Sequence, residues 1–257
     1  MRVRLLAAVA LVGATGLSAQ ANETPINTDR PDFTESSTLV PAHRLQFETG
    51  YTWTAASRVI GGGGSSTWPE ILVRYGLSTR FELRLGESFT TSSPPTDQGH
   101  RFTTRDDLYA GVKIGLAAQH GGRPQLAILV QATLPSGDKR TSAQITLPGA
   151  AFLAGWELSP SWSLDLGVEV NRVTGDAWEL APSASLGHMI SGRVGGFAEL
   201  YAFVPTSSNS GAPTPQYADA GLSLLLSNTI QIDGRIGAGL GGSADRYFLG
   251  FGFAIRR

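Results

Sequence analysis

Apolar side chains recur at every second position in twelve stretches of this chain, most of them about ten residues long. In the first stretch Leu45, Phe47 and Tyr51 fall on one face, whereas Gln46 and Glu48 fall on the other. Such alternation predicts β-strands with one apolar face, and about ten residues are enough to cross a bilayer as a tilted strand. The stretches are residues 44–53, 67–75, 80–89, 106–118, 125–134, 149–158, 162–173, 177–188, 192–204, 216–226, 229–240 and 247–255.

The connections between these stretches alternate between long and short. Outer-membrane barrels have an even number of antiparallel strands, short periplasmic turns and longer outer loops. If the amino end is periplasmic, the periplasmic turns are residues 76–78, 120–123, 159–161, 189–191 and 227–228. The longer outer loops are then residues 55–66, 90–105, 135–148 and 205–215. Two further outer connections, near Gly175 and Gly242, are short. The pattern predicts an all-β fold, a transmembrane antiparallel up-and-down β-barrel of about 12 strands.

A secreted soluble β-sandwich would also have alternating strands, but three observations favour the barrel. Strands of soluble sheets are usually about five or six residues long. Charged residues make up only 16% of the chain, against roughly 25% in soluble domains. Aromatic residues on the apolar face lie mostly toward strand ends, as expected for rings at a membrane interface. They are Trp53, Tyr75, Phe81, Phe89, Trp156, Trp162 and Trp178.

The amino terminus has the features of a secretory signal peptide. Arg2 and Arg4 precede an apolar run, residues 5–17, and Ala19-Gln20-Ala21 is a small-residue cleavage signature. No later stretch reaches the roughly 18 continuous apolar residues of a membrane helix. The expected location is therefore the outer membrane of a Gram-negative bacterium. The expected parts are a signal peptide cleaved near Ala21 (residues 1–21), a periplasmic amino-terminal segment (22–43) and the barrel (44–257).

Most charged residues of the predicted strands fall on the face opposite the apolar one, which would line the lumen. Exceptions such as Glu87 and Arg172 lie near outer strand ends, where the ~2–4 kcal/mol cost of a basic side chain at mid-bilayer falls to about 0–1 kcal/mol. The predicted lumen lining is Arg44, Glu48, Glu70, Arg74, Arg80, Glu82, Arg84, Asp107, Lys113, Asp165, Glu169, Glu179, Arg193, Glu199, Asp219, Asp233 and Arg235.

These inward charges have two interpretations. Interior ion pairs can fill and stiffen a small barrel without conduction. Glu82 lies between Arg80 and Arg84 on one strand face, and a hairpin near residue 227 can set Asp219 opposite Arg235. Alternatively, an open 12-strand bore uses a mixed-charge lining that admits small polar or amphipathic solutes. Ten acids against seven bases in this set argue against strong anion selectivity.

The residues before and within the first stretch carry a family resemblance. The motifs are Thr28-Asp29-Arg30-Pro31-Asp32-Phe33-Thr34-Glu35-Ser36, then Val40-Pro41 and Gln46-x-Glu48-x-Gly50-Tyr51. This amino end resembles the outer-membrane transporter family named for a meta-cleavage pathway of phenol degradation. Leu126–Gly137 and Asp245–Phe253 are similar to that family's fifth-strand end and closing strand. The resemblance implies an outer-membrane barrel that passes small, hydrophobic or aromatic compounds.

The segment before the first stretch is too polar to cross lipid as a strand, and its Pro31 lacks a backbone donor. One interpretation is a local salt-bridged turn that fixes the entry to the first strand. The other is a segment directed into the lumen, where it pairs with wall charges and narrows the bore. The candidate lumen-restricting residues are Asp29, Arg30, Asp32 and Glu35.

Catalytic, metal and nucleic-acid chemistry find little support in the sequence. A barrel phospholipase needs neighbouring Ser and His side chains on the lipid face, but His188 and Ser191 lie at a turn. The four histidines are isolated and cysteine is absent, so we expect no metal and no cofactor. Loss of Arg2 and Arg4 changes the formal net charge from −1 to about −3, which is too weak to suggest a nucleic-acid partner. We expect that the protein is not an enzyme.

Two functional hypotheses remain. The first is a channel or transporter for small solutes, with hydrophobic or aromatic compounds as candidates. The second is a structural or surface-interaction barrel with a closed lumen. The outer loops lack the clustered aromatic anchors of a binding hot spot, which favours transport. The expected partners are outer-membrane lipid, small-molecule solutes and the barrel-insertion machinery, although the chain ends on Arg257 rather than on the aromatic residue that such machinery usually reads.

Overall fold

The computed structural model describes residues 23–57, 62–93, 100–175, 177–206, 214–241 and 243–257. The predicted signal peptide, residues 1–21, and the predicted mature start at Asn22 lie outside the described residues. The strands are β1 (Leu45–Ala55), β2 (Gly64–Gly76), β3 (Phe81–Ser93), β4 (Phe102–Arg105), β5 (Leu108–Ala117), β6 (Gln125–Leu134), β7 (Leu147–Ser159), β8 (Trp162–Val173), β9 (Ala177–Met189), β10 (Val194–Ala202), β11 (Val204–Pro205), β12 (Gln216–Ser227), β13 (Ile230–Gly241) and β14 (Tyr247–Arg256).

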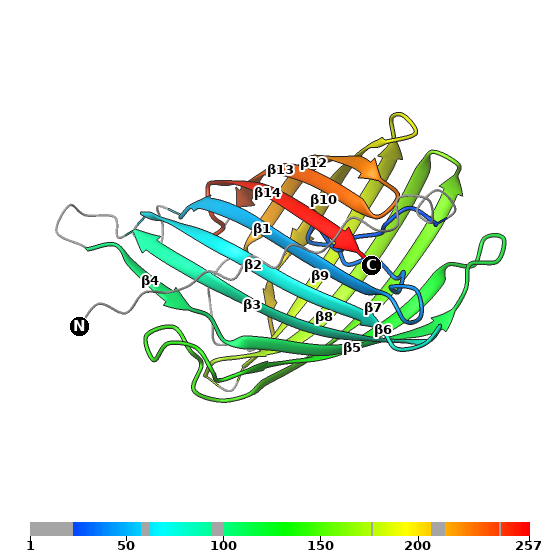
Figure 1. The fold of residues 1–257 in the computed structure, drawn as a ribbon. Helices are drawn as coiled ribbons and strands as arrows, with labels where there is room; N and C mark the ends of the chain where they lie inside the picture. The colour runs from blue at the N-terminus through cyan, green and yellow to red at the C-terminus, as the bar shows by residue number, and fades with distance from the viewer. Residues whose placement is uncertain (1–22, 58–61, 94–99, 176, 207–213, 242) are drawn as a thin grey trace, which may run out of the picture.

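Twelve of these strands form a closed antiparallel barrel (Figure 1). Consecutive strands pair around the ring, and the first and last strands close it, from Gln46 opposite Arg256 to Ala55 opposite Tyr247. The two short strands are additions to the wall, since β4 pairs with β3 and β11 pairs with β9. The prediction of an all-β, 12-strand up-and-down barrel is confirmed. Among the described residues, no helix is long and apolar enough to cross a membrane.

The strand boundaries differ from the predicted stretches mainly at two places. The second strand begins at Gly64 rather than residue 67, and the third continues to Ser93 rather than residue 89. Both extensions are polar, so alternation of apolar residues could not reveal them. They lie beyond a bulge that interrupts the β2–β3 pairing between Thr67 and Glu70, and β3 gains a second partner there in β4.

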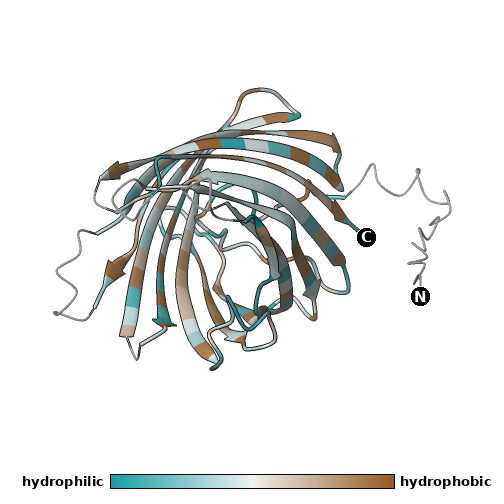
Figure 2. Cartoon of the chain, turned by 90° about the vertical axis from the view of Figure 1, so that its left-hand side faces the viewer, coloured by the Kyte–Doolittle hydropathy of each residue, from teal (hydrophilic) through white to brown (hydrophobic). Residues whose placement is uncertain are grey.

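The two faces of the wall differ in polarity. Apolar side chains such as Leu85 and Phe251 are 53% and 60% exposed on the outside, where lipid would cover them. Inward neighbours such as Glu82 and Lys113 are fully buried. Figure 2 shows the strands as a ring, with hydrophilic and hydrophobic bands along them. The barrel interior is therefore a polar core with only small apolar clusters.

Aromatic side chains lie at the end of the barrel that carries the short turns. The indole nitrogen of Trp156 donates to the Gly122 carbonyl at 3.1 Å, and the Trp162 ring lies 4.2 Å from the His188 ring. The Nδ1 atom of His188 lies 3.0 Å from the Ser161 carbonyl oxygen. These amphipathic rings suit a membrane interface, so this rim would lie at one surface of the bilayer.

Candidate functional site

Residues 23–43, here called the amino-terminal segment, run inside the barrel and bond to its wall. Its hydrogen bonds reach nine of the twelve wall strands. The wall partners are Gln46 and Glu48 of β1, Glu70 and Arg74 of β2, Glu82 and Arg84 of β3, Lys113 of β5, Gln125 of β6, Ser185 of β9, Glu199 of β10, Gln231 of β13, and Phe251 and Arg256 of β14.

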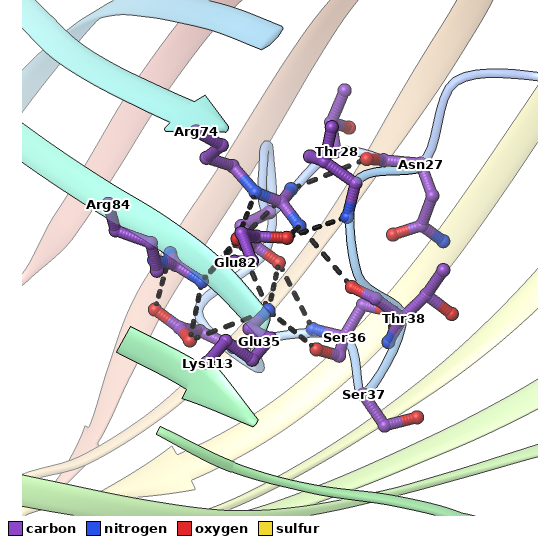
Figure 3. A network of polar contacts seen from close by, with 12 residues as sticks. Asn27, Thr28, Glu35, Ser36, Ser37, Thr38, Arg74, Glu82, Arg84 and Lys113 are labelled. Atoms are coloured by element: carbon purple, nitrogen blue, oxygen red, sulfur yellow. Dashed lines mark hydrogen bonds and ion pairs between the residues drawn. The ribbon is translucent and has the colours of Figure 1, made fainter. Parts of the chain in front are cut away.

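A cluster of three cations forms one side of the interior (Figure 3). Arg74, Arg84 and Lys113 come from three adjacent strands, β2, β3 and β5. Arg74 and Arg84 are direct cross-strand partners, and their side chains are almost completely buried. Three buried cations in one place require compensating charge, and four carboxylates supply it.

Asp29 of the amino-terminal segment contacts all three cations. Its carboxylate lies 3.1 Å from Arg74, 2.8 Å from Arg84 and 3.3 Å from Lys113. Burial acts to raise the pKa of Asp29, but the three neighbouring cations outweigh it and hold the pKa well below its ordinary value. Asp29 therefore stays charged at physiological pH.

The other carboxylates of the cluster come from both the segment and the wall. Glu35 of the segment lies 3.0 Å from Arg84, and burial raises its pKa against the opposing effect of Arg84. On the wall, Glu82 and Glu48 lie 2.8 Å and 3.0 Å from Arg74. Without the segment, three wall cations would face only two wall carboxylates.

Next to Asp29, the segment presents a cation to wall acids. The Arg30 guanidinium lies 2.6 Å from Glu70 and 3.8 Å from Asp233. It packs flat against the wall where Gly50 and Gly252 are cross-strand partners. A Cβ atom on Gly50 would lie 2.1 Å from Arg30 Cζ, and one on Gly252 would lie 2.4 Å from its Nε. The segment is thus complementary to the wall in charge and in shape.

Backbone groups of the segment are anchored farther around the ring. The amides of Phe33 and Thr34 donate to the two carboxylate oxygens of Glu199 at 2.6 Å each. Next to this contact the Phe33 ring stacks on Tyr201 at 4.3 Å. Tyr201 belongs to an inward aromatic cluster whose other members are Phe203, Tyr217 and Phe248.

Asp32 faces acids rather than cations. Ser185 donates to its carboxylate at 3.1 Å. Burial raises the pKa of Asp32 well above its ordinary value, and the neighbouring Glu199 and Asp165 raise it further. This side of the segment therefore favours a protonated carboxyl group.

Unfilled space remains beside the segment on this acidic side. A cavity of about 280 Å³ opens at the short-turn end between the segment and strands β8 to β10, with Asp32, Asp165, Trp162 and His188 in its lining. A smaller cavity of about 70 Å³ lies between Ser37 and the β7 and β8 wall. The cation-cluster side carries the ion pairs that hold the segment, whereas the acidic side retains space.

The structure separates the predicted lumen residues into groups. Eight are buried on the wall: Glu48, Arg74, Glu82, Arg84, Lys113, Glu199, Asp219 and Asp233. Five are partly exposed on the wall: Glu70, Asp165, Glu169, Glu179 and Arg235. The remaining four lie outside the strands, each just before a strand begins: Arg44, Arg80, Asp107 and Arg193.

These four placements correct the sequence interpretation, because the strands begin one or two residues later than the alternation suggested. Arg80 and Arg193 lie exposed in short turns, outside the pairing of β2 with β3 and of β9 with β10. Asp107 accepts the amides of Gly137 and Ala143 at 2.8 Å and 2.9 Å, so it fastens the connection between β6 and β7. Arg44 lies directly before β1. None of the four belongs to a strand of the wall.

The predicted pairing of Asp219 with Arg235 is offset by two residues. Arg235 lies opposite Gly221, and Asp219 lies opposite Gly237. The two charges still meet diagonally at 3.6 Å. A bulge near Ser227 shifts the register, which counting from the turn could not show.

Uncharged polar residues also hold the segment, and the sequence interpretation omitted them. Gln46 donates to the Asn27 carbonyl at 2.8 Å, Gln125 to the Ser37 carbonyl at 3.1 Å, and Gln231 to the Thr28 hydroxyl at 2.7 Å. All three occupy inward-facing positions of their strands. A prediction that listed every inward polar residue, and not only the charged ones, would have included them. Within the described residues, no group of three or more His, Asp or Glu side chains could hold a metal ion.

Comparisons with known proteins agree with this architecture. The sequence model of a family described as "Putative MetA-pathway of phenol degradation" matches residues 28–256, and a comparison with curated proteins found no match. The COG4313 outer membrane channel from Pseudomonas putida F1 is 13% identical with a TM-score of 0.64, covering 90% of this chain and 100% of that one. The NanC porin is 6% identical (TM-score 0.57, 82% and 98% covered). The translocator domain of autotransporter NalP from Neisseria meningitidis is 12% identical (0.52, 82% and 87%). At these identities the likeness establishes the fold, that of outer-membrane barrels.

Proposed function

The chain belongs to the phenol-degradation family whose model matches residues 28–256, and from that premise we propose that it is an outer-membrane channel for small solutes. In this proposal the amino-terminal segment restricts the lumen and must shift before solutes pass freely. The observation that carries the proposal is the docking of Asp29 among Arg74, Arg84 and Lys113. A segment held by side-chain ion pairs, without strand pairing of its own, can leave the wall intact when it moves.

The lining left behind would be divided by charge. Arg74, Arg84 and Lys113 form a basic region on β2, β3 and β5, and Glu70 of β2 and Asp233 of β13 form an acidic region where Arg30 now lies. Neighbouring regions of opposite charge favour dipolar or amphipathic solutes over simple anions. The aromatic cluster around Tyr201 adds a surface on which a planar apolar ring can pack, which supports small hydrophobic or aromatic compounds as the substrate class.

One observation favours the second hypothesis, a structural barrel with a closed lumen. Arg74 pairs with three carboxylates while completely buried, and removing one partner from a buried ion network costs about 3–5 kcal/mol. A network of that strength could hold the segment permanently. The two hypotheses therefore differ in whether the segment moves.

A reversible tether tests this difference directly. A Cβ atom on Gly155 of β7 would lie 3.7 Å from the Cβ atom of Ser37, which is within the usual disulfide range. The chain contains no cysteine, so Ser37→Cys with Gly155→Cys introduces one defined bond between segment and wall. The matched control, Ser163→Cys with Gly187→Cys, has a spacing of 3.8 Å and links two neighbouring wall strands.

Single-channel conductance of the refolded barrels in planar bilayers gives the readout. We expect the oxidised tether to abolish opening and a reductant to restore it, whereas the control should conduct equally in both states. Deleting residues 23–36 should raise conductance above that of the intact chain. Equal conductance of the tethered and reduced forms would show that the segment does not gate. Absence of conduction in every form, including the deletion, would favour the structural barrel.

A further inference from the structure

A group of cations lies outside the lumen, at the end of the barrel that we expect to face outward. Arg101 directly precedes β4, Arg105 is its last residue, and Lys139 and Arg140 lie in the connection between β6 and β7. All four are exposed. We call these four residues the outer basic patch. Figure 1 shows β4 beside the end of β3, at one end of the barrel.

Backbone contacts bring the two loops of the patch together. The amide of Arg105 donates to the Asp138 carboxylate at 2.7 Å, and the amide of Asp138 donates to the Arg105 carbonyl at 2.9 Å. The Arg105 guanidinium also donates to the Ser136 carbonyl. The Arg140 guanidinium lies 5.4 Å from the centre of the Phe102 ring. These contacts join the two loops, so the four cations lie on neighbouring loops despite their distance in sequence.

The neighbouring acids are bound by groups other than Arg101, Lys139 and Arg140. Asp106 accepts the hydroxyls of Ser88 and Thr90 at 2.6 Å and 2.8 Å. Asp107 accepts two loop amides, and these bonds lower its pKa despite its partial burial. Glu87 lies 3.4 Å from Arg105 and neutralises that one cation. Within the part of the chain that the structure describes, the other three members of the patch form no ion pair with a carboxylate.

The patch lies directly above lipid-facing surface. Arg105 is the cross-strand partner of Phe89, which has the same outward parity as Leu85 lower on β3. Ile145, in the same connection as Lys139, is also exposed. Cations above an exposed apolar track match an amphiphile that has an anionic head and hydrocarbon chains. A soluble anion would use only the first of these two features.

From this arrangement we propose that the outer basic patch binds the phosphate groups of the phosphorylated glycolipid, lipid A, that forms the outer leaflet of a Gram-negative outer membrane. Arginine and lysine donate charge-assisted hydrogen bonds to phosphate, and the acyl chains would lie along β3, β5 and β6. The inference rests on the outer-membrane placement and orientation of the barrel. It does not depend on conduction.

The opposite rim provides a matched control. Arg80, Arg123 and Arg193 are also exposed, but they lie in three different periplasmic turns. The test variant is Arg101→Gln, Lys139→Gln and Arg140→Gln, which leaves Arg105 to hold the loops together. The control variant is Arg80→Gln, Arg123→Gln and Arg193→Gln, which removes the same charge from the periplasmic side.

Binding of bisphosphorylated lipid A to the full mature barrel in detergent, followed by native mass spectrometry, gives the readout. We expect the test variant to bind at least tenfold more weakly than the wild type and the control variant to bind equally well. Monophosphorylated lipid A should show a smaller difference between wild type and test variant. Replacing Arg101 and Arg140 by Lys should retain part of the affinity, which a merely misfolded loop would not.

Three outcomes would overturn the proposal. Equal binding by the test variant and the wild type would exclude the patch. An equal loss in the control variant would mean that only bulk charge matters. Displacement of lipid A by an equal concentration of inorganic phosphate would identify a site for the free anion instead of the lipid. Conductance should be unchanged in the test variant, which keeps this result separate from the channel proposal.

Discussion

The carboxylate of Asp29 lies 2.8 Å from the guanidinium of Arg84, although 55 positions separate the two residues in the sequence. The first belongs to a segment without regular structure and the second to a membrane-crossing strand. Their contact is therefore the point where the segment and the wall most directly depend on each other.

Asp29→Asn should release the segment. The change leaves Arg74, Arg84 and Lys113 with one acid fewer in a buried site, which costs about 3–5 kcal/mol. We expect a higher open probability in single-channel recordings and faster proteolysis within residues 23–43.

Glu23→Gln is the charge-matched control for this change. Glu23 also belongs to the segment, but its nearer partner Arg44 is 43% exposed and its second partner, Arg256, lies 3.6 Å away. Removing this acid should therefore cost less than removing Asp29 from three buried cations. A similar gain in conductance from both variants would contradict the assigned role of the cation cluster.

Gly50→Ala should displace the Arg30 side chain. The new methyl group would overlap the guanidinium, and the flexible side chain can move away more easily than the wall can. Arg30 then loses Glu70 and Asp233. The expected result is the same increase in conductance that Arg30→Ala produces.

A double-mutant cycle separates this effect from damage to the strand. In an Arg30→Ala background, Gly50→Ala should have little further effect, giving a coupling of about 0.5–3 kcal/mol. Gly241→Ala, where a Cβ atom meets nothing within 4 Å, should be neutral in either background. Additive effects of Gly50→Ala and Arg30→Ala would rule out the proposed contact.

Val130→Lys and Gln131→Lys compare the two faces of β6 at one depth. Val130 is 53% exposed on the outside, so a lysine there should destabilise the barrel by ~2–4 kcal/mol. The Gln131 amide already lies 3.4 Å from Glu169, and a lysine could pair with that acid. Urea unfolding in lipid vesicles measures both, and equal destabilisation would mean that the faces are assigned wrongly.

Lowering the pH from 8 to 5 should strengthen docking of the segment. The pKa of Asp32 is raised when the segment is docked beside Glu199 and Asp165, so the docked form binds the proton more tightly than the released form. Docking is then strongest below the ordinary pKa of Asp32 and weakens as the pH rises through the raised value.

Conductance recorded across this range should therefore fall as the pH falls. Asp29 does not contribute, because its lowered pKa keeps it charged throughout. Burial in the docked segment also raises the pKa of Glu35, so Asp32→Asn should lose part of the pH dependence and the double variant Asp32→Asn, Glu35→Gln should lose most of it. A slope that persists in the double variant would assign the effect to other groups.

Alternation along the sequence was sufficient to predict the barrel, because lipid imposes one polarity on each face of every strand. Glu48, Glu82 and Lys113 share the interior for this reason. Register was harder to predict, since bulges such as the one near Ser227 depend on local backbone packing. The diagonal contact of Asp219 with Arg235 shows the consequence.

The sequence left two interpretations of the amino-terminal segment open because its charges were equally compatible with a local turn. The pairing of wall charges across the first and last strands depends on closure of the ring. A local sequence pattern does not predict how the ring closes. The cross-strand pair Gly50 and Gly252 was also hidden for this reason. Glycines in strands have many causes, and only the closed ring shows that these two make room for Arg30.

The seam between β1 and β14 has a consequence for the order of assembly. Arg30 donates to the Phe251 carbonyl of β14, while the Asp29 amide donates to Glu48 of β1. Arg256 on β14 donates to the Thr24 carbonyl. Because two of these three partners lie on the last strand, the segment gains its full set of contacts only after that strand has met the first. A chain stalled with its seam open would lack the β14 contacts, so proteases should cut its segment faster than that of a closed barrel.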